Sequence, residues 1–378
     1  MTPQILISAG EASSEMYAAR LAGVLQQRTG AHLFGMGGRR MREAGVELVA
    51  DAGEIAVVGI FEVLKKLPAV FRIRSRLLKE AAARKPALAI LIDSPGFNLG
   101  LARQLRNRGV RVAYFIGPQI WAWRPGRVRW IKKRVERMLV IFPFEEEFYR
   151  KHGVAATFVG HPLVDKVHAN LTREEFIKQN RLDLARPVVA VLPGSRPGEI
   201  AHHLPVIIDA IKQLRSELRP VSPQFVLAAA TSLNVQHFQP FLRGIEDVTV
   251  IEGQTYNALA AADCAIVSSG TATVEAGLLG VPMVVIYRLS RLTAFVARRL
   301  VSTPFFAMVN LILGKGVVPE LIQDDFTPQS LAAETKHLLA SPAARAEMKA
   351  EFAELRSKMG PDGAIERAAE VIAAMLRQ

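Results

Sequence analysis

The chain has 378 residues, half of them apolar, and this length exceeds what a single hydrophobic core usually holds. Its one cysteine, Cys264 in an apolar run, excludes an intrachain disulfide, and no apolar run reaches the roughly 20 residues that a membrane-spanning helix needs. The net charge of +13 suits nucleic acid, an anionic membrane surface or a phosphorylated substrate, and by itself does not choose among them.

The first part of the chain alternates apolar runs with helical patterns. Strands are predicted over residues 4–9, 32–34, 87–92, 110–115, 138–142 and 157–159, and helices over 13–27 and 98–107. The first apolar run lacks a basic leader and a cleavage site, so we interpret it as a strand and not as a signal peptide. Because the strands are almost continuously apolar, they are typical of a parallel sheet covered on both faces.

A second series of the same kind follows a more polar connection at residues 160–186. Its predicted strands cover 187–192, 225–227, 248–251, 264–267 and 283–287, and three more helices are predicted over 327–340, 343–358 and 363–377. The expected fold is α/β, with two facing doubly wound, Rossmann-like domains, and the last helix could return to the first of them. Ligands of open sheets of this type bind at the carboxyl ends of the strands.

The loop after the strand at 187–192 carries Gly194, Ser195 and Arg196 just before a predicted helix. A glycine lets the backbone approach a ligand closely, a helix start presents free N–H groups to an anion, and a guanidinium suits a phosphate. The alternative is an ordinary strand–helix turn with a solvated arginine. We favour an anion site, because all three features meet at one strand end.

A second loop of small residues, with Ser269, Gly270, Thr271 and Thr273, opens another predicted helix. Small residues leave room for a diphosphate at the helix N-terminus, and Glu275, about one turn into the helix, could accept hydrogen bonds from a ribose diol. The alternative is a well-capped helix whose glutamate stabilises the helix dipole. Since capping alone does not need so many small residues, we predict a nucleotide site.

Two carboxylates follow strand ends in the first domain. Glu11 lies in a small-residue loop after the first strand, and Asp93 ends the strand at 87–92. Asp93 is a candidate general base, although a free aspartate, with a pKa of about 4, is a weak one and would act by positioning. Its alternative role is a turn or cap for the next helix, where Asn98 could cap instead. A capping box with Ser13 or Ser14 as the N-cap would leave Glu11 unexplained.

A loop with two of the three tryptophans follows the strand at 110–115. Trp121 and Trp123, next to Arg124, could contact a sugar face or an acyl chain, or could form the core of a long loop. A second basic run begins there, at residues 124–137, and could bind a phosphate.

The segment 65–85 is rich in Lys and Arg and can be helical from Pro68 on. Its apolar residues include Leu67, Val70, Phe71 and Leu77. Such a helix could lie in a membrane interface, where each basic residue near an anionic bilayer contributes roughly 1 kcal/mol. The alternative is a helix that covers the sheet and has a solvated charged face; both can hold, because the apolar residues exceed a single buried stripe.

No Asp-x-Asp, His-Glu-x-x-His or Cys-x-x-Cys pattern occurs, so neither a metal nor another cofactor is indicated. The pairs His202-His203 and Asp324-Asp325 are interpreted as surface residues. Gly35-Met36-Gly37-Gly38 matches only a fragment of a dinucleotide fingerprint, and it receives little weight as a cofactor site.

These motifs together resemble the lipid-A-disaccharide synthase family, and the resemblance covers essentially the whole chain. The matching segments are Gly10-Glu11-Ala12-Ser13, Ile92-Asp93-Ser94-Pro95, Phe97-Asn98, Trp121-Ala122-Trp123-Arg124, Phe158-Val159-Gly160-His161-Pro162, Leu192-Pro193-Gly194-Ser195-Arg196, Ser269-Gly270-Thr271-Ala272-Thr273 and Pro282-Met283-Val284-Val285. Each piece is weak, but their order makes the combination specific. Departures occur at Ser14-Glu15, where the family usually has Gly-Asp, and at Gly96, where it often has a second acid.

The resemblance implies a glycosyltransferase B fold, with an acceptor-binding, membrane-facing domain at 1–165, a UDP-sugar domain at 166–359, and a last helix at about 360–378 on the first domain. It implies an inverting transfer of 2,3-diacylglucosamine from UDP to 2,3-diacylglucosamine 1-phosphate, which forms the β-1,6 disaccharide of lipid A. It also implies a peripheral protein on the cytoplasmic side of the inner membrane and a possible homodimer with exchanged C-terminal segments.

The resemblance also carries over three site residues. The position of Asp93 matches a candidate base of the family, and that of Arg196 matches an essential residue of the donor site. Asn310 matches a position that is linked to the donor site as well.

Two rival functions stay open from the sequence. A UDP-N-acetylglucosamine 2-epimerase shares the architecture, but would act on a soluble substrate and would have no use for the surface at 65–85. A basic nucleic-acid-binding protein is the other rival, although the basic residues are not interleaved with aromatic side chains on which bases could stack.

Overall fold

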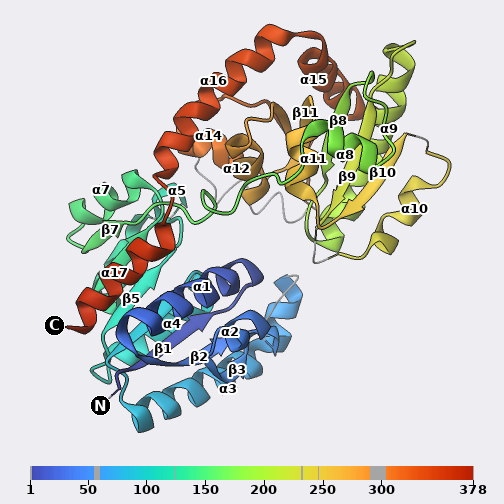
Figure 1. The fold of residues 1–378 in the computed structure, drawn as a ribbon. Helices are drawn as coiled ribbons and strands as arrows, with labels where there is room; N and C mark the ends of the chain where they lie inside the picture. The colour runs from blue at the N-terminus through green and yellow to red at the C-terminus, as the bar shows by residue number, and fades with distance from the viewer. Residues whose placement is uncertain are drawn as a thin grey trace. The chain divides into compact units, whose positions relative to one another are not determined.

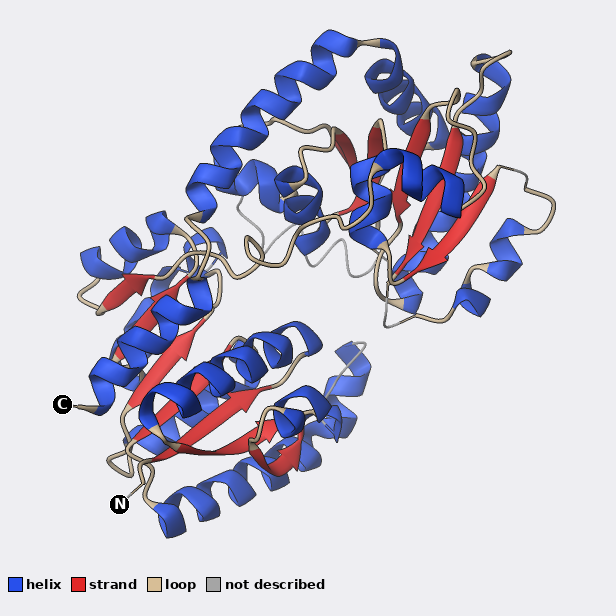
Figure 2. Cartoon of the chain, viewed as in Figure 1, coloured by secondary structure: helices blue, strands red, loops and turns tan. Residues whose placement is uncertain are grey.

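The structure is a computed structural model that describes residues 2–54, 60–123, 125–230, 233–245, 247–289 and 304–377. The chain divides into two compact units, one made of Met1–Asp165 with Met359–Gln378 and the other of Lys166–Lys358 (Figure 1). In each unit helices pack against a parallel sheet (Figure 2). The predicted fold class of two doubly wound α/β domains is therefore confirmed.

The first unit is built around a seven-stranded sheet. Its strands are β1 (Gln4–Ala9), β2 (His32–Gly37), β3 (Glu47–Asp51), β4 (Leu88–Ile92), β5 (Val112–Phe115), β6 (Arg137–Val140) and β7 (Ala156–Phe158). Its helices are α1 (Ala12–Thr29), α2 (Arg39–Glu43), α3 (Ile60–Arg84), α4 (Pro95–Arg106), α5 (Ile120–Trp123), α6 (Val128–Arg134), α7 (Pro143–Lys151) and α17 (Ala364–Leu376), with short 3-10 turns at Ala52–Glu54 and Pro125–Arg127. All strand pairs are parallel, in the order β3-β2-β1-β4-β5-β6-β7.

The second unit repeats this plan with six strands. They are β8 (Val188–Leu192), β9 (Gln224–Ala229), β10 (Val248–Glu252), β11 (Cys264–Ser268), β12 (Met283–Tyr287) and β13 (Glu320–Ile322), in the order β10-β9-β8-β11-β12-β13, all parallel. The helices are α8 (Arg173–Gln179), α9 (Pro197–Glu217), α10 (Gln239–Leu242), α11 (Thr255–Ala261), α12 (Thr271–Leu278), α14 (Met308–Leu313), α15 (Pro328–Ala340) and α16 (Pro342–Met359), with a 3-10 turn at Val235–His237.

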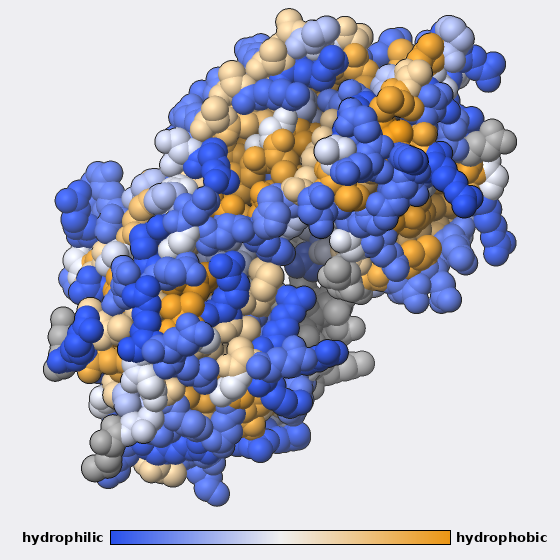
Figure 3. Space-filling model, viewed as in Figure 1, coloured by the Kyte–Doolittle hydropathy of each residue, from blue (hydrophilic) through white to orange (hydrophobic). Residues whose placement is uncertain are grey.

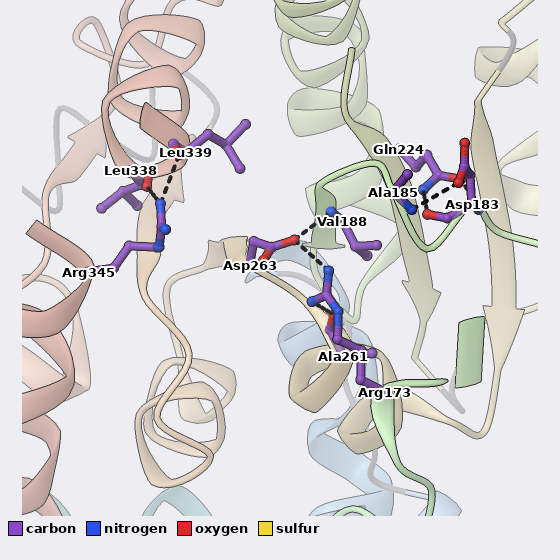
Figure 4. Close-up of polar contacts among 10 residues, drawn as sticks. All are labelled: Arg173, Asp183, Ala185, Val188, Gln224, Ala261, Asp263, Leu338, Leu339 and Arg345. Carbon is purple, nitrogen blue, oxygen red and sulfur yellow. Dashed lines mark hydrogen bonds and ion pairs between the residues drawn. The ribbon is translucent and has the colours of Figure 1, made fainter. Parts of the chain in front are cut away.

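Polar side chains fix the ends of elements in the second unit (Figure 4). Asp263 accepts hydrogen bonds from Arg173 Nη2 at 2.9 Å and from the backbone N–H of Val188 at 2.8 Å, so one carboxylate oxygen joins α8 to the start of β8. Arg345 Nη1 donates to the last carbonyls of α15, at 2.6 Å from Leu338 and 2.8 Å from Leu339. The Arg345 contacts satisfy helix-end carbonyls that would otherwise need water.

The C-terminal helix belongs to the first unit. The apolar face of α17 packs on α1 (Figure 1). Its start is fixed by Arg367 Nε, which donates to the Val159 carbonyl at 2.9 Å, and by the Gly363 N–H, which donates to Asp165 Oδ1 at 2.7 Å. The last helix therefore contributes to the core around α1.

Three local features differ from the sequence prediction. Strands β3 and β13 were not predicted, because both are short and partly exposed and so lack a continuous apolar run. Helix α3 begins at Ile60, so Pro68 lies inside it and not in its first turn. Proline removes a single backbone bond, and Pro68 is exposed, so water can satisfy the carbonyl that it leaves unpaired.

The glycines at the end of β2 serve strand packing. Gly35 has φ +155°, and a Cβ at this position would lie 1.9 Å from the carbonyl oxygen of Ile7 on β1. The pairing of β2 with β3 also shifts register between Gly35 and Met36. A side chain at residue 35 would therefore separate β2 from β1.

None of the helices in the described ranges is long and apolar enough to cross a bilayer. Both units show a mostly hydrophilic surface with separate apolar patches in the view of Figure 3. The large apolar side chains that are exposed in the described part of the chain are Leu67, Phe71, Trp130, Leu184, Val221 and Phe306.

Candidate functional site

Each sheet reverses its strand order beside its first strand, between β1 and β4 in the first unit and between β8 and β11 in the second. In open parallel sheets a ligand binds outside the carboxyl ends of the strands at such a point. Glu11 and Asp93 follow β1 and β4, and the loops 194–196 and 269–271 follow β8 and β11. The candidate residues of each unit are therefore grouped at its switch point.

Asp93 occupies a strained turn. Its φ is +50° and that of Ser94 is +47°, and left-handed conformations of non-glycine residues cost on the order of 1–3 kcal/mol. Backbone contacts hold the turn: the Asp93 N–H donates to the Phe115 carbonyl at 3.0 Å, and the Asp93 carbonyl accepts from Tyr114 Oη at 2.6 Å. The surrounding strands thus fix the position of this carboxylate.

Asn98 is buried and supports the same turn. Its Nδ2 donates to the Asp93 carbonyl at 2.9 Å and to the Ile92 carbonyl at 3.1 Å, and its Oδ1 accepts from Ser8 Oγ at 2.8 Å. The idea that Asn98 caps the following helix is therefore wrong, because α4 begins at Pro95 and Asn98 lies within it. Its amide joins β1 to β4 at the switch point.

The pKa of the Asp93 carboxyl is raised from its ordinary 3.8 to about 6. Burial is the main cause, the negative charge of Glu11 adds to it, and the N–H of Ser94 opposes it. A carboxylate with this pKa is mostly ionised at neutral pH and accepts a proton more readily than a free aspartate does. Buried acids of this kind are typical of functional sites.

Glu11 is itself the N-cap residue of α1. Ser14 Oγ accepts from the Glu11 N–H at 3.1 Å and donates to the Glu11 carbonyl at 2.9 Å, so the serine supports the helix start from inside. The prediction that Ser13 or Ser14 is the N-cap is therefore wrong. Glu15 Oε1 accepts from the Arg40 N–H at 2.7 Å and so serves the start of α2. Of these two glutamates, Glu11 is the one whose charge acts on Asp93.

Trp121 is anchored inside its loop. Its Nε1 donates to Glu145 Oε1 at 3.1 Å, and its ring meets that of Phe144 edge-on at 4.8 Å. Glu145 is buried, and burial raises its pKa to about 7. Trp121 is thus held by α7 at one edge of its ring system and is only partly buried. The side chain of Trp123 and the whole of Arg124 lie outside the described residues.

The loop after β8 is organised by Glu199, which sequence reasoning missed. Gly194 has φ +134°, and a Cβ there would lie 2.7 Å from the Cβ of Glu199, so only glycine fits. Glu199 accepts from the Ser195 N–H at 2.8 Å and pairs with Arg196 Nη1 at 2.8 Å. The Arg196 side chain is nevertheless 61% exposed, so its guanidinium can meet a ligand.

The start of α12 leaves space at Gly270. The φ of Gly270 is +149°, and a Cβ built there would meet nothing within 4 Å. Thr271 is exposed beside it. Thr273 is buried and its hydroxyl donates to the Gly270 carbonyl at 2.8 Å, while Ser269 Oγ donates to the Phe306 carbonyl at 2.7 Å. The Thr273 hydroxyl therefore supports the start of the helix from inside.

Glu275 lies one turn into α12 and is partly buried. Its Oε1 accepts a hydrogen bond from Tyr256 Oη at 2.8 Å, and Lys166 Nζ lies 5.6 Å from the centre of the Tyr256 ring. The tyrosine therefore fixes the direction of the carboxylate.

Asn310 is completely engaged with the protein. Its Nδ2 donates to the Val318 carbonyl at 2.9 Å and to Glu320 Oε1 at 2.8 Å, and its Oδ1 accepts from the N–H groups of Val317 at 2.8 Å and Val318 at 3.0 Å. Glu320 in turn accepts from the Phe306 N–H at 2.8 Å. These bonds make Asn310 a link between α14 and the start of β13.

His203 is fully buried, so the interpretation of the His202-His203 pair as surface residues is wrong for it. Its Nε2 accepts from the Arg288 N–H at 3.0 Å, and its Nδ1 therefore carries the proton and donates to the Pro193 carbonyl at 2.6 Å. Burial lowers its pKa, which favours this neutral form. The ring joins the loop after β8 to the end of β12.

The predicted membrane-facing residues of α3 separate into two groups. Phe71 is 62% and Leu67 is 38% exposed. Val70 is partly buried against the core, and Leu77 is fully buried. The prediction for Leu77 is wrong, because it belongs to the stripe of α3 that faces the sheet.

Within the described ranges, no three His, Cys, Asp or Glu side chains are close enough to hold a metal ion.

Solved structures share this architecture. The calicheamicin glycosyltransferase superimposes with a TM-score of 0.63 at 15% identity, over 100% of this chain and 99% of that protein. A UDP-GlcNAc 2-epimerase from Neisseria meningitidis, bound to UDP-GlcNAc, gives 0.62 at 12% identity, over 100% of both chains. At such identities the likeness shows the fold alone, which is that of the glycosyltransferase B group.

Sequence relatives are more specific. The lipid-A-disaccharide synthase of Solibacter usitatus is 45% identical over 376 residues, which cover 99% of this chain and 98% of that protein. That of Myxococcus xanthus is 44% identical over 377 residues, with the same coverage. A family model described as lipid-A-disaccharide synthetase matches residues 5–374. The chain therefore belongs to the lipid-A-disaccharide synthase family, the glycosyltransferases that make the lipid A disaccharide.

Proposed function

We propose that the protein transfers 2,3-diacylglucosamine from UDP to the 6-hydroxyl of 2,3-diacylglucosamine 1-phosphate with inversion. Asp93 carries this proposal: it is a partly buried carboxylate, with a pKa of about 6, fixed at the switch point of the first sheet. Such a group can accept a hydroxyl proton near neutral pH as the new bond forms. The first unit would hold the acceptor and the second unit the donor.

The proposed reaction is a single displacement. The acceptor O6 forms a bond to C1 of the donor sugar, and its proton moves to a carboxylate oxygen of Asp93. The bond between C1 and the diphosphate oxygen breaks, and its electron pair leaves with UDP. Attack opposite the leaving group turns an α-linked donor into the β-1,6 product. Glu11 assists by keeping the pKa of Asp93 high.

The leaving diphosphate would be held by the loops of the second unit. The Arg196 guanidinium would leave its ion pair with Glu199 and bind one phosphate group of the diphosphate. The N–H groups at the start of α12 would bind the second phosphate group. Open space at Gly270 supports this, because a diphosphate needs close access to the backbone. Ser195, Ser269 and Thr271 border the same loops, and Glu275 would accept from the ribose hydroxyls.

A peripheral position on the cytoplasmic face of the inner membrane fits these substrates, since each buried methylene adds roughly 0.8 kcal/mol to membrane retention. The exposed side chains of Leu67, Phe71 and Trp130 could insert at the interface. Trp130 lies between Arg127 and Arg134, whose guanidinium carbons are 5.9 and 5.4 Å from its ring centre. Tryptophan beside arginine is typical of membrane interfaces.

We also propose a homodimer, which a measurement of the molecular mass of the protein in solution would test.

The decisive experiment incubates purified protein with the UDP-diacyl sugar and the diacyl sugar phosphate and analyses the products by mass. The proposal predicts a disaccharide monophosphate and UDP in equal amounts, and a β-anomeric signal in the proton NMR spectrum. The rival epimerase activity predicts the manno epimer from UDP-N-acetylglucosamine alone. Formation of that epimer without disaccharide would replace the proposal.

A further inference from the structure

Three arginines of the first unit gather around α4 without a carboxylate partner. Arg74 comes from α3, Arg134 from α6, and Arg103 from α4 itself. Both neighbouring helices contact α4. Within the described ranges, no acidic side chain forms an ion pair with any of the three, whereas Arg84 and Arg111 are held by glutamates at 2.6 Å.

Two of the guanidinium groups contact the same stretch of α4. Arg74 Nη2 lies 3.4 Å from the Phe97 carbonyl, and its guanidinium carbon would lie 2.9 Å from a Cβ at Gly100. Arg134 Nη1 donates to the carbonyl of Leu99 at 3.3 Å. Arg103 follows one turn later, and residues three and four apart share a helix face. A glycine at residue 100 is what lets Arg74 come this close.

This arrangement of positive charge is unfavourable without a ligand. Burial lowers the pKa of Arg74, and burial together with the charge of Arg103 lowers the pKa of Arg134. Arg84 and Arg111, by contrast, have raised pKa values because their glutamates stabilise the charge. Arg74 Nε is also buried and has no hydrogen-bond partner in the described part of the chain. An anion at this place would relieve the repulsion between Arg103 and Arg134, offset the burial of the Arg74 charge, and supply an acceptor for this N–H.

The surroundings of the cluster match a ligand that is both charged and apolar. Phe71, an exposed aromatic residue of α3, has its ring centre 6.0 Å from the Arg74 guanidinium carbon. Trp130, half exposed on α6, stacks near Arg134. Charged groups flanked by exposed aromatic side chains fit a phosphate group on an acylated molecule better than a free anion.

We propose that Arg74, Arg103 and Arg134 form a binding site for the phosphate group of an acylated ligand, and that in the transfer reaction this group is the 1-phosphate of the acceptor. The identification of this group as the 1-phosphate of the acceptor rests on the proposed function. Asp93 lies in the turn just before α4, and Gly100 lies five residues after Pro95, the first residue of this helix, which corresponds to roughly 8 Å at 1.5 Å per residue. That span is comparable to the size of a hexose ring, so a sugar with O6 at Asp93 could place its phosphate here.

The test compares Arg74→Gln and Arg134→Gln with Arg76→Gln and Arg129→Gln, which replace exposed arginines on the same two helices. Steady-state rates are measured in neutral detergent micelles with donor saturating. We expect each cluster variant to raise KM for the acceptor about tenfold, the effect of losing one charged hydrogen bond, with kcat and the donor KM nearly unchanged. Both controls should stay near the wild-type values. Equal KM values in the cluster variants and the controls would overturn the proposal.

Two further measurements identify the group that is recognised. Wild-type protein given diacylglucosamine without its phosphate should show the same rise in KM, and the variants should show no additional rise with it. Flotation with phosphatidylcholine vesicles, with or without phosphatidic acid, tests a lipid headgroup as the source. Loss of binding to phosphatidic acid in the variants, with an unchanged acceptor KM, would overturn the assignment to the acceptor.

Calorimetric titration with the acceptor in micelles needs no turnover and separates this proposal from the function. If wild-type protein makes no disaccharide yet binds the acceptor, and the cluster variants bind it about tenfold more weakly, the phosphate site stands and the proposed reaction fails. If turnover occurs but cluster variants and controls bind the acceptor equally, the site fails and the reaction stands. Inorganic phosphate alone should compete in the same titration only for the wild type and the controls.

Discussion

Replacement of Asp93 by asparagine separates the stability of the protein from its activity. Asparagine has nearly the same shape and is one of the few residues that readily adopt the left-handed conformation found here. The backbone bonds to Phe115 and Tyr114 involve only main-chain atoms of residue 93 and are kept. The change therefore removes the charge and leaves the turn.

The size of the effect follows from the pKa. The pKa of Asp93 rises from 3.8 to about 6 on folding, and because each pKa unit corresponds to about 1.4 kcal/mol, ionised Asp93 costs the folded state about 3 kcal/mol. For an acid whose folded pKa is raised, the folded state binds the proton more tightly. The cost is therefore absent below pH 3.8, grows between pH 3.8 and 6, and is complete above that range.

Asp93→Asn should thus be more stable than the wild type by about 3 kcal/mol at pH 8, with the difference vanishing near pH 4. Urea unfolding of both proteins across this range measures it, and Glu54→Gln, an exposed carboxylate of the same unit, is the control that should show no such trend. Turnover at saturating substrate should fall by a factor of about 100 or more. A variant that is no more stable at pH 8 would refute the buried-charge argument, and near-normal turnover would refute the role as base.

Three other substitutions test the candidate residues. Glu11→Gln removes the second cause of the raised pKa of the proposed base, so the acidic limb of the kcat profile should move to lower pH; an unmoved limb would contradict that coupling. Gly194→Ala should weaken UDP binding in a calorimetric titration and cost on the order of 1–3 kcal/mol of stability, because its φ is +134° and its Cβ would clash, whereas Gly198→Ala has open space and should change neither. His203→Leu leaves a buried carbonyl and a buried N–H unpaired, which should cost about 1–3 kcal/mol each in urea unfolding; a loss no larger than that of the exposed control His202→Leu would refute its linking role.

Residues that act across long sequence separations could not be predicted from the sequence. His203 bonds to Pro193 and to Arg288, which lies 85 residues further along the chain. Glu320 accepts hydrogen bonds from Asn310 and from the Phe306 N–H, and the Phe306 carbonyl accepts one from Ser269. No local pattern marks these partners, because the hydrogen bonds form only when strands from distant parts of the chain pair. The burial of Leu77 was missed for a related reason, since a helix with apolar residues on several sides does not reveal which side meets the sheet.

The strands and the residues that follow them, in contrast, can be predicted from the sequence. Runs of apolar residues predicted the strands β1, β4, β8 and β11, since a strand covered on both faces has no place for polar side chains. The parallel arrangement then implied that residues after these strands lie at one edge of each sheet. The sequence by itself therefore determined which residues stand at the switch points and, through the resemblance, the family.

Only the tertiary structure decided what those residues can do. The carboxylate of Asp93 has a pKa of about 6 because folding buries it and brings Glu11, 82 positions earlier, close to it. Arg74, Arg103 and Arg134 come together because three helices pack side by side, although they are spread over 61 residues of sequence. Charge and hydrogen bonding depend on distance in space, and for these side chains that distance is set by packing and not by position in the chain.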